Sequence, residues 1–211
     1  MKKIIVNFKD KFNNLEIATY IENNSHLDYS ICVPNDYVNT GNIKAYSQDL
    51  FSIENLKENN YCGSILGHRD YKDDIDTVIK KINQLHKSDL EIIICLGEKE
   101  KKDNAYLDLI NTIDLIYNSI SSYNNIIIVY EPHWAIGGNN NIDTSYIINN
   151  ITYIKNHICD KFNITSNLYY GGSVNLELIS KIDSLDIVSG YLVSSFVLEG
   201  SNLEKLINLI N

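Results

Sequence analysis

The segment IVYEPHWAIGG, residues 128–138, places a carboxylate at the end of an aliphatic run and follows it with a proline and two glycines. The aliphatic residues 126–129 are typical of a strand buried on both faces, as in parallel sheets. Pro132 cannot donate to a strand ladder, so the strand must stop at Glu131. In parallel α/β sheets, ligands bind and catalytic residues gather at the carboxyl ends of the strands. Glu131 is therefore a candidate catalytic residue.

Strand-like and helix-like stretches alternate along the rest of the chain. Strand patterns occupy residues 4–8, 29–33, 43–46, 64–67, 92–96, 126–130, 167–170 and 187–193. Apolar residues spaced by three and four predict helices over residues 15–21, 75–85, 107–120, 147–158, 176–182 and 203–210. This order is typical of a (β/α)8 barrel or a doubly wound sheet, and the number of strands favours the barrel.

The length of the chain predicts a single domain over residues 1–211, because 211 residues are enough for one well-buried core and too few for two. One part of the barrel is short. The interval between Pro34 and His68 cannot hold two strands, two helices and their connections, which average ~40 residues or more. We therefore predict a shortened α/β barrel, in which the second helix, expected over residues 35–42, and the third β-to-α loop are reduced or missing.

Composition excludes several classes of partner. The formal net charge of −9, with both signs interspersed, argues against nucleic acid and against an anionic membrane surface. Residues 1–25 lack a signal-peptide pattern, and no apolar run approaches the ~20 residues of a membrane span. The cysteines are scattered, which predicts neither a disulfide framework nor a zinc site. We expect a cytoplasmic protein with reduced thiols.

Most of the ten glycines fall at or near the ends of predicted strands: Gly67, Gly97, Gly137, Gly138, Gly171, Gly172 and Gly190. Glycines there let backbone N–H groups approach a ligand closely, which suggests an anion held by the main chain. Ordinary strand-to-helix turns explain part of this pattern. They explain less well why two glycine pairs flank the later strands, where barrels commonly place a phosphate site.

Five short motifs carry a family resemblance: NFK at 7–9, ILGH at 65–68, ICLGE at 94–98, YEPHWAIGG at 130–138 and YGGSVN at 170–175. In this order, and spread over nearly the whole chain, they resemble the triosephosphate isomerase family. The resemblance implies interconversion of dihydroxyacetone phosphate and D-glyceraldehyde 3-phosphate through an enediolate, a step of glycolysis and gluconeogenesis. It implies a phosphorylated triose as substrate and neither a metal nor an organic cofactor.

The resemblance also assigns the catalytic roles. Glu131 matches the base that moves the carbon-bound proton. His68 matches the neutral histidine that polarises the carbonyl group, and Lys9 matches the cation that offsets phosphate and enediolate charge. Asn7 matches the residue that orients this region.

Phosphate binding and lid closure are implied in the same way. Backbone N–H groups of Gly137, Gly172 and Ser173 match the phosphate ligands, joined by Ser194 and Ser195 at the end of the eighth strand. The family has a lid that closes over the phosphate. Its stiff hinge is matched by Pro132, His133 and Trp134, and its tip by Ala135, Ile136, Gly137 and Gly138. Tyr170 and Ser173 match the residues that hold the closed lid, and Glu98 matches the acid that meets Trp134.

The chain also departs from the family pattern. Asp70 stands where the family has the glutamate that pairs with the lysine, and it is one methylene shorter. Ser194 and Ser195 replace two glycines, and their Cβ atoms restrict φ, which predicts weaker phosphate binding. The remaining histidines, His133 among them, are interpreted as surface or hinge residues.

Assembly and alternative functions follow from the same comparison. The family implies a homodimer made through the third β-to-α loop, which is short here, so we expect a weakened or rearranged dimer or a monomer. One alternative is another sugar-phosphate isomerase or a Schiff-base aldolase, although an aldolase needs a lysine where Glu131 stands. Another is a weak or inactive phosphate-binding barrel, which the presence of Lys9, His68 and Glu131 disfavours.

Overall fold

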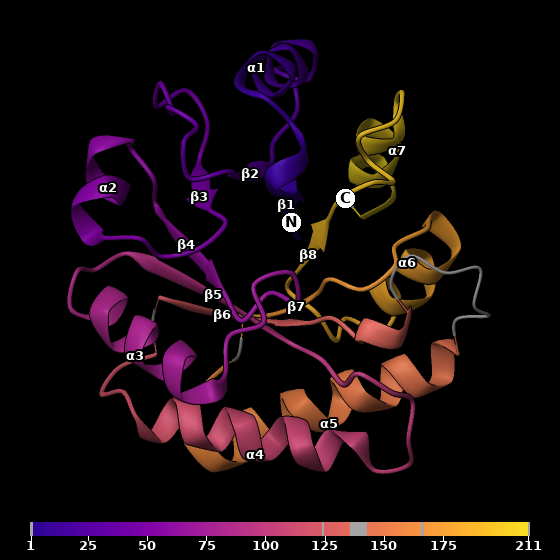
Figure 1. The fold of residues 1–211 in the computed structure, drawn as a ribbon. Helices are drawn as coiled ribbons and strands as arrows, with labels where there is room; N and C mark the ends of the chain where they lie inside the picture. The colour runs from indigo at the N-terminus through magenta and orange to yellow at the C-terminus, as the bar shows by residue number, and fades with distance from the viewer. Residues whose placement is uncertain (1, 124, 136–142, 166, 211) are drawn as a thin grey trace.

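The computed structural model describes residues 2–123, 125–135, 143–165 and 167–210. Within them, parallel strands close into a barrel in chain order, with β1 hydrogen-bonded to both β2 and β8 (Figure 1). The strands are β1 (Lys3–Asn7), β2 (Ser30–Val33), β3 (Ala45–Ser47), β4 (Gly63–Leu66), β5 (Glu91–Leu96), β6 (Ile126–Tyr130), β7 (Leu168–Tyr170) and β8 (Gly190–Val193). The predicted (β/α)8 barrel is confirmed.

Helices surround the strands on the outside of the barrel (Figure 1). They are α1 (Asn14–Asn23), α2 (Ile53–Glu58), α3 (Ile75–His86), α4 (Ala105–Asn118), α5 (Thr144–Phe162), α6 (Leu176–Asp183) and α7 (Asn202–Ile210), with short 3-10 turns η1 (Lys9–Lys11) and η2 (His133–Ala135). Side-chain caps fix the first turns of several helices. Asp143 accepts from the N–H of Tyr146 at the start of α5, and Asp74 accepts from that of Thr77 at the start of α3. None of the described helices is both long and apolar enough to cross a membrane.

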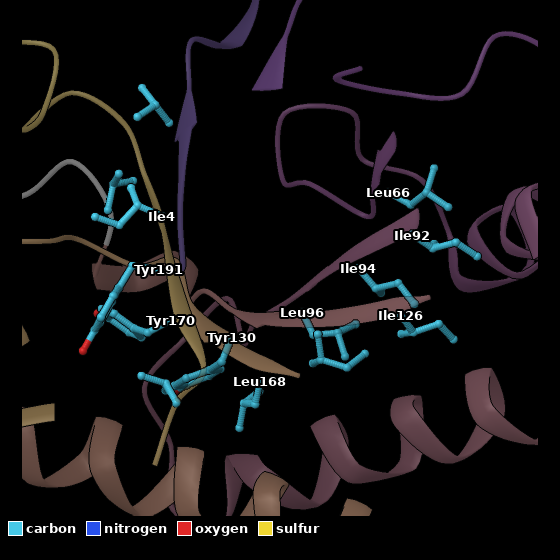
Figure 2. Packing of buried hydrophobic residues seen from close by; sticks show 14 of the residues in the cluster. Ile4, Leu66, Ile92, Ile94, Leu96, Ile126, Tyr130, Leu168, Tyr170 and Tyr191 are labelled. Carbon is cyan, nitrogen blue, oxygen red and sulfur yellow. The ribbon is translucent and has the colours of Figure 1, made fainter. Parts of the chain in front are cut away.

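Alternate residues of each strand point to opposite faces of the barrel wall, so the core has two parts. Inside the barrel, Cys32, Tyr46, Ile93 and Val129 belong to one buried cluster. Outside it, residues such as Ile94 pack in the layer between the strands and the helices (Figure 2). Because both faces of the strands are buried, the strands appear in the sequence as continuous apolar runs.

The shortened part of the barrel lies where the sequence predicts it. Residues 34–44 join β2 to β3 without a helix, residues 48–52 form a short loop after β3, and α2 has 6 residues. Tyr61 holds this connection in place, since its buried side chain donates from the hydroxyl to the carbonyl oxygens of Pro34 at 2.8 Å and Tyr37 at 2.6 Å. An open pocket of about 870 Å³ remains beside the amino-terminal parts of β2 and β3.

Candidate active site

The carboxyl ends of the strands surround a cavity of about 320 Å³. Side chains and backbone from β1, β4, β6, β7 and β8, or from the loops that follow them, line it. Among the predicted site residues, the lining includes Asn7, Lys9, His68, Glu131, Gly172, Ser173, Ser194 and Ser195. The structure therefore brings together residues that are up to 188 positions apart, counted from Asn7 to Ser195.

Glu131 and His68 face each other across this cavity. The backbone N–H of Glu131 donates to the carbonyl oxygen of Leu96 at 2.8 Å, which continues the β5–β6 ladder one residue beyond β6. The Glu131 side chain is 2% exposed, and its Oε2 lies 4.0 Å from His68 Nε2. This separation is too long for a direct hydrogen bond but leaves both groups facing the same space.

A contact with the backbone indicates which ring nitrogen of His68 carries the proton. The N–H of Asp70 donates to His68 Nδ1 at 3.4 Å, so the neutral ring carries its proton on Nε2, the atom that faces Glu131. Burial lowers the pKa of His68, while the negative charges of Glu131 and Asp70 oppose this shift and Lys9 and Arg69 add to it. The ring can therefore act as a neutral hydrogen-bond donor.

Lys9 reaches the cavity from an unusual backbone conformation. Its φ of +56° lies in the left-handed region, which costs a residue other than glycine about 1–2 kcal/mol. The Asn7 side chain offsets this cost, because its Oδ1 accepts the N–H of Lys9 at 2.9 Å. Gln48, just after β3, donates from Nε2 to the same oxygen. Gln48 is a site residue that the sequence reasoning missed, because its contact with Asn7 depends on which segments meet in space.

The turn η2, where the predicted lid begins, is attached to the segment that follows β5. Trp134 Nε1 donates to Glu98 Oε1 at 2.8 Å, and the Tyr130 hydroxyl donates to the same oxygen at 3.0 Å. Asn150 in turn donates to the Tyr130 hydroxyl at 2.9 Å. Glu98 is 7% exposed, so these donors replace the water lost at Oε1, while the buried Oε2 has no hydrogen-bond partner within the described residues.

A second attachment joins the lid to the loop after β7. The Ser173 hydroxyl donates to the carbonyl oxygen of Ala135, and the Tyr170 hydroxyl donates to that of Ser173 at 3.4 Å. Pro132 accepts the N–H of Ala135 at 3.0 Å and so opens the turn η2. The predicted lid residues Ile136, Gly137 and Gly138 lie outside the described residues.

Two departures from the family pattern behave differently from expectation. Asp70 contacts Arg69 Nε at 3.5 Å and His68 Nδ1 at 3.6 Å, and within the described residues it forms no ion pair with Lys9. Neither Ser194 nor Ser195 has a positive φ, so their Cβ atoms cause no backbone strain.

The described residues contain no group of three or more His, Cys, Asp or Glu side chains that could hold a metal ion. The four cysteines are free thiols. Burial raises the pKa of the Cys95 thiol well above its usual value, with a further contribution from the charge of Glu131. Cys95 is therefore suited to packing inside the barrel and not to nucleophilic chemistry.

A closed parallel barrel with a carboxylate, a neutral imidazole and an amine at its mouth defines a class of enzyme that moves protons on a small anionic substrate. The comparisons with known proteins narrow this class. The family model described as "Triosephosphate isomerase" matches residues 3–210, so the chain belongs to the triosephosphate isomerase family. This membership makes the chain an isomerase.

Several relatives carry the name triosephosphate isomerase. The protein from Buchnera aphidicola is 32% identical over 194 residues, which cover 85% of this chain and 75% of the relative. That from Mycoplasma genitalium is 28% identical, with 96% of each chain covered. That from Malacoplasma penetrans is 28% identical over 247 aligned positions, with 99% of each chain covered. Because the last alignment is longer than this chain of 211 residues, the relative contains segments that this chain lacks.

Proposed function

We propose that this protein catalyses the interconversion of dihydroxyacetone phosphate and D-glyceraldehyde 3-phosphate, with Glu131, His68 and Lys9 as its catalytic residues. The observation that carries the proposal is the approach of Glu131 Oε2 to within 4.0 Å of His68 Nε2, in a cavity that Lys9 also lines. A base, a neutral proton donor and a cation are the groups that enediolate chemistry needs.

In this mechanism the Glu131 carboxylate takes the proton from the carbon next to the carbonyl group. The Nε2–H of His68 donates a hydrogen bond to the carbonyl oxygen as negative charge develops there, and the Lys9 ammonium group stabilises the same charge. Glu131 then returns the proton to the neighbouring carbon, while the proton on oxygen is exchanged through His68. Atoms and electrons balance without an oxidant or a second substrate.

The loops after β7 and β8 are the proposed phosphate site. Gly172, Ser173, Ser194 and Ser195 border the same cavity as Glu131, and their backbone N–H groups and hydroxyls are suitable donors to an anion. Gly137 would join them from the lid. Attachment of the lid through Trp134 to Glu98 supports a role for Pro132, Trp134 and the following residues in excluding water.

A coupled assay with glyceraldehyde 3-phosphate tests the proposal. The wild type should isomerise the substrate well above the spontaneous rate, and Glu131→Asp should be slower because its shorter carboxylate misses the carbon-bound proton. A wild type without activity would favour the alternative of a phosphate-binding barrel that has lost catalysis. Undiminished activity of Glu131→Asp would exclude Glu131 as the base.

We further propose that residues 1–211 act as one domain, in the cytoplasm, and that the protein forms a weakened dimer or a monomer. The loop after β3, which makes the dimer in the family, comprises residues 48–52 only, and its Phe51 is 75% exposed. Free cysteines and a charged substrate that does not cross membranes unaided support the location. Sedimentation at micromolar concentration should show dissociation, and a tight dimer would contradict this proposal.

A further inference from the structure

His133 occupies a defined place beside the candidate base. It is the first residue of η2, and its backbone N–H donates to the carbonyl oxygen of Glu98 at 3.0 Å. Its ring lies over Gly97, where even a single Cβ atom would come within 3.2 Å of the ring atom Cδ2. The backbone hydrogen bond and the glycine together fix the ring at the end of β5.

The ring of His133 points toward Glu131. Its Nε2 lies 3.7 Å from Glu131 Oε1, while the other carboxylate oxygen, Oε2, faces His68 Nε2. Both His133 Nε2 and Glu131 Oε1 are buried, and neither has a hydrogen-bond partner within the described residues. An unpaired buried acceptor or donor costs about 1–3 kcal/mol. A movement of about 0.5 Å would bring the two atoms into a hydrogen bond.

We propose that His133 is a positioning residue for the base: its Nε2–H holds Glu131 Oε1, so that Oε2 is the oxygen presented to His68 and to the substrate. This inference rests on the proposed role of Glu131. A carboxylate held at one oxygen keeps its other oxygen aimed at the proton it must take, and small misplacements of a catalytic group are costly. The sequence predicts a surface or hinge role for His133, because proximity in the chain does not reveal the direction in which the ring points.

Three variants test the proposal by steady-state kinetics. His133→Leu removes the donor, and we expect kcat to fall about 10-fold with KM within about 2-fold, because orientation of the base is lost and substrate binding is not. His133→Gln places an amide N–H near the position of Nε2, and it should recover kcat to within about 3-fold of wild type. His26→Gln, at an exposed site after α1, is the matched control and should have no effect.

The split between kcat and KM separates positioning from a merely structural role, because a general distortion of the site would also weaken substrate binding. Rescue by His133→Gln is the second such readout. A wild-type kcat for His133→Leu, or a KM that rises as much as kcat falls, would overturn the proposal.

Nuclear magnetic resonance of the histidine rings tests the contact without activity. Replacing Glu131 by Gln should shift the ring nitrogen signals of His133 and leave those of His26 in place. Unshifted His133 signals would overturn the contact even if His133→Leu fails to fold. If the wild type proves inactive while these signals do shift, the proposed function fails and the contact between His133 and Glu131 stands.

Discussion

The barrel wall at β5 and β6 is built differently from the wall at β2 and β3. β5 and β6 are 6 and 5 residues long, share five registered pairs, and are covered by α4 and α5 of 14 and 19 residues. β2 and β3 are 4 and 3 residues long, share three pairs, and have no helix between them. The well-covered side carries Glu98, Glu131 and the turn η2. The thin side contributes only Gln48, behind Asn7, to the residues described above.

This difference shows which parts of such a barrel can be reduced. Catalytic side chains follow the ends of strands, and strand ends stay in register as long as the ladder on either side is kept. The covering helix mainly buries apolar surface and contributes stability. A barrel can therefore lose a helix on the side away from the base and keep the geometry of its mouth.

The largest effect should come from the well-covered side. Glu131→Gln removes the base but keeps the size of the side chain, and we expect kcat to fall about 1,000-fold with a small change in KM. Because Gln has nearly the same shape as Glu, the fold should not change, and circular dichroism checks this. A loss of less than about 10-fold would show that another residue is the base and that the chemistry does not depend on the well-covered side.

Matched core substitutions compare the stability of the two sides. Ile94 in β5 and Ile31 in β2 are both fully buried in the layer outside the barrel. We expect Ile94→Ala to lower the free energy of unfolding by about 4 kcal/mol and Ile31→Ala by about 2 kcal/mol, because the thin wall beside Ile31 can collapse into the space. Denaturant titrations give both values. Equal losses would show that Tyr61 and its neighbours support β2 as well as a helix would.

Gln48 tests whether the thin side still serves the site. Gln48→Leu removes the donor to Asn7 Oδ1, which in turn holds the N–H of Lys9 in its left-handed conformation. We expect kcat/KM to fall about 10-fold, equivalent to about 1.4 kcal/mol. The substitution Gln48→Glu keeps an acceptor but no donor, and it should be at least as damaging. Full activity in both variants would confine the site to the well-covered side.

The pH dependence of stability reports on His68. Burial lowers its pKa, so the unfolded chain takes up a proton below its ordinary pKa of about 6.5 while the folded chain does not. The free energy of unfolding should therefore fall as pH drops through this value, by at most about 1.4 kcal/mol per pH unit from this group. His68→Gln should show a shallower slope between pH 7 and pH 5 than the wild type, whereas the exposed control His26→Gln should not.

The smallest effect is expected at the end of β8. Since Ser195 has no positive φ, replacing it by Gly relieves no strain, and KM should change by less than about 3-fold. Initial-rate kinetics over a range of substrate concentrations measure this. A large improvement in KM would show that the serine does hinder the phosphate site, as its sequence alone suggested.

The sequence was most informative where one residue type has one physical meaning. Long apolar runs located the strands to within a few residues, and Pro132 fixed the end of β6 at the position before Glu131. The helix α2 was missed because its 6 residues are too few to show a period. Gln48 and the contact of His133 with Glu131 could not be foreseen, because they depend on which loops meet in space. The absence of a helix over residues 35–42 was predictable from the short interval between Pro34 and His68 and from the lack of helical periodicity in that segment.

The bare connection between β2 and β3 also makes the fold open to modification. Gly41 in this connection has a φ of +84° and empty space where a Cβ would lie. An engineered segment joined at Gly41 could cover β2 and β3 as the absent helix would have done. Such a graft would change the stability of the protein, while the candidate active site at the mouth of the barrel would keep its chemistry.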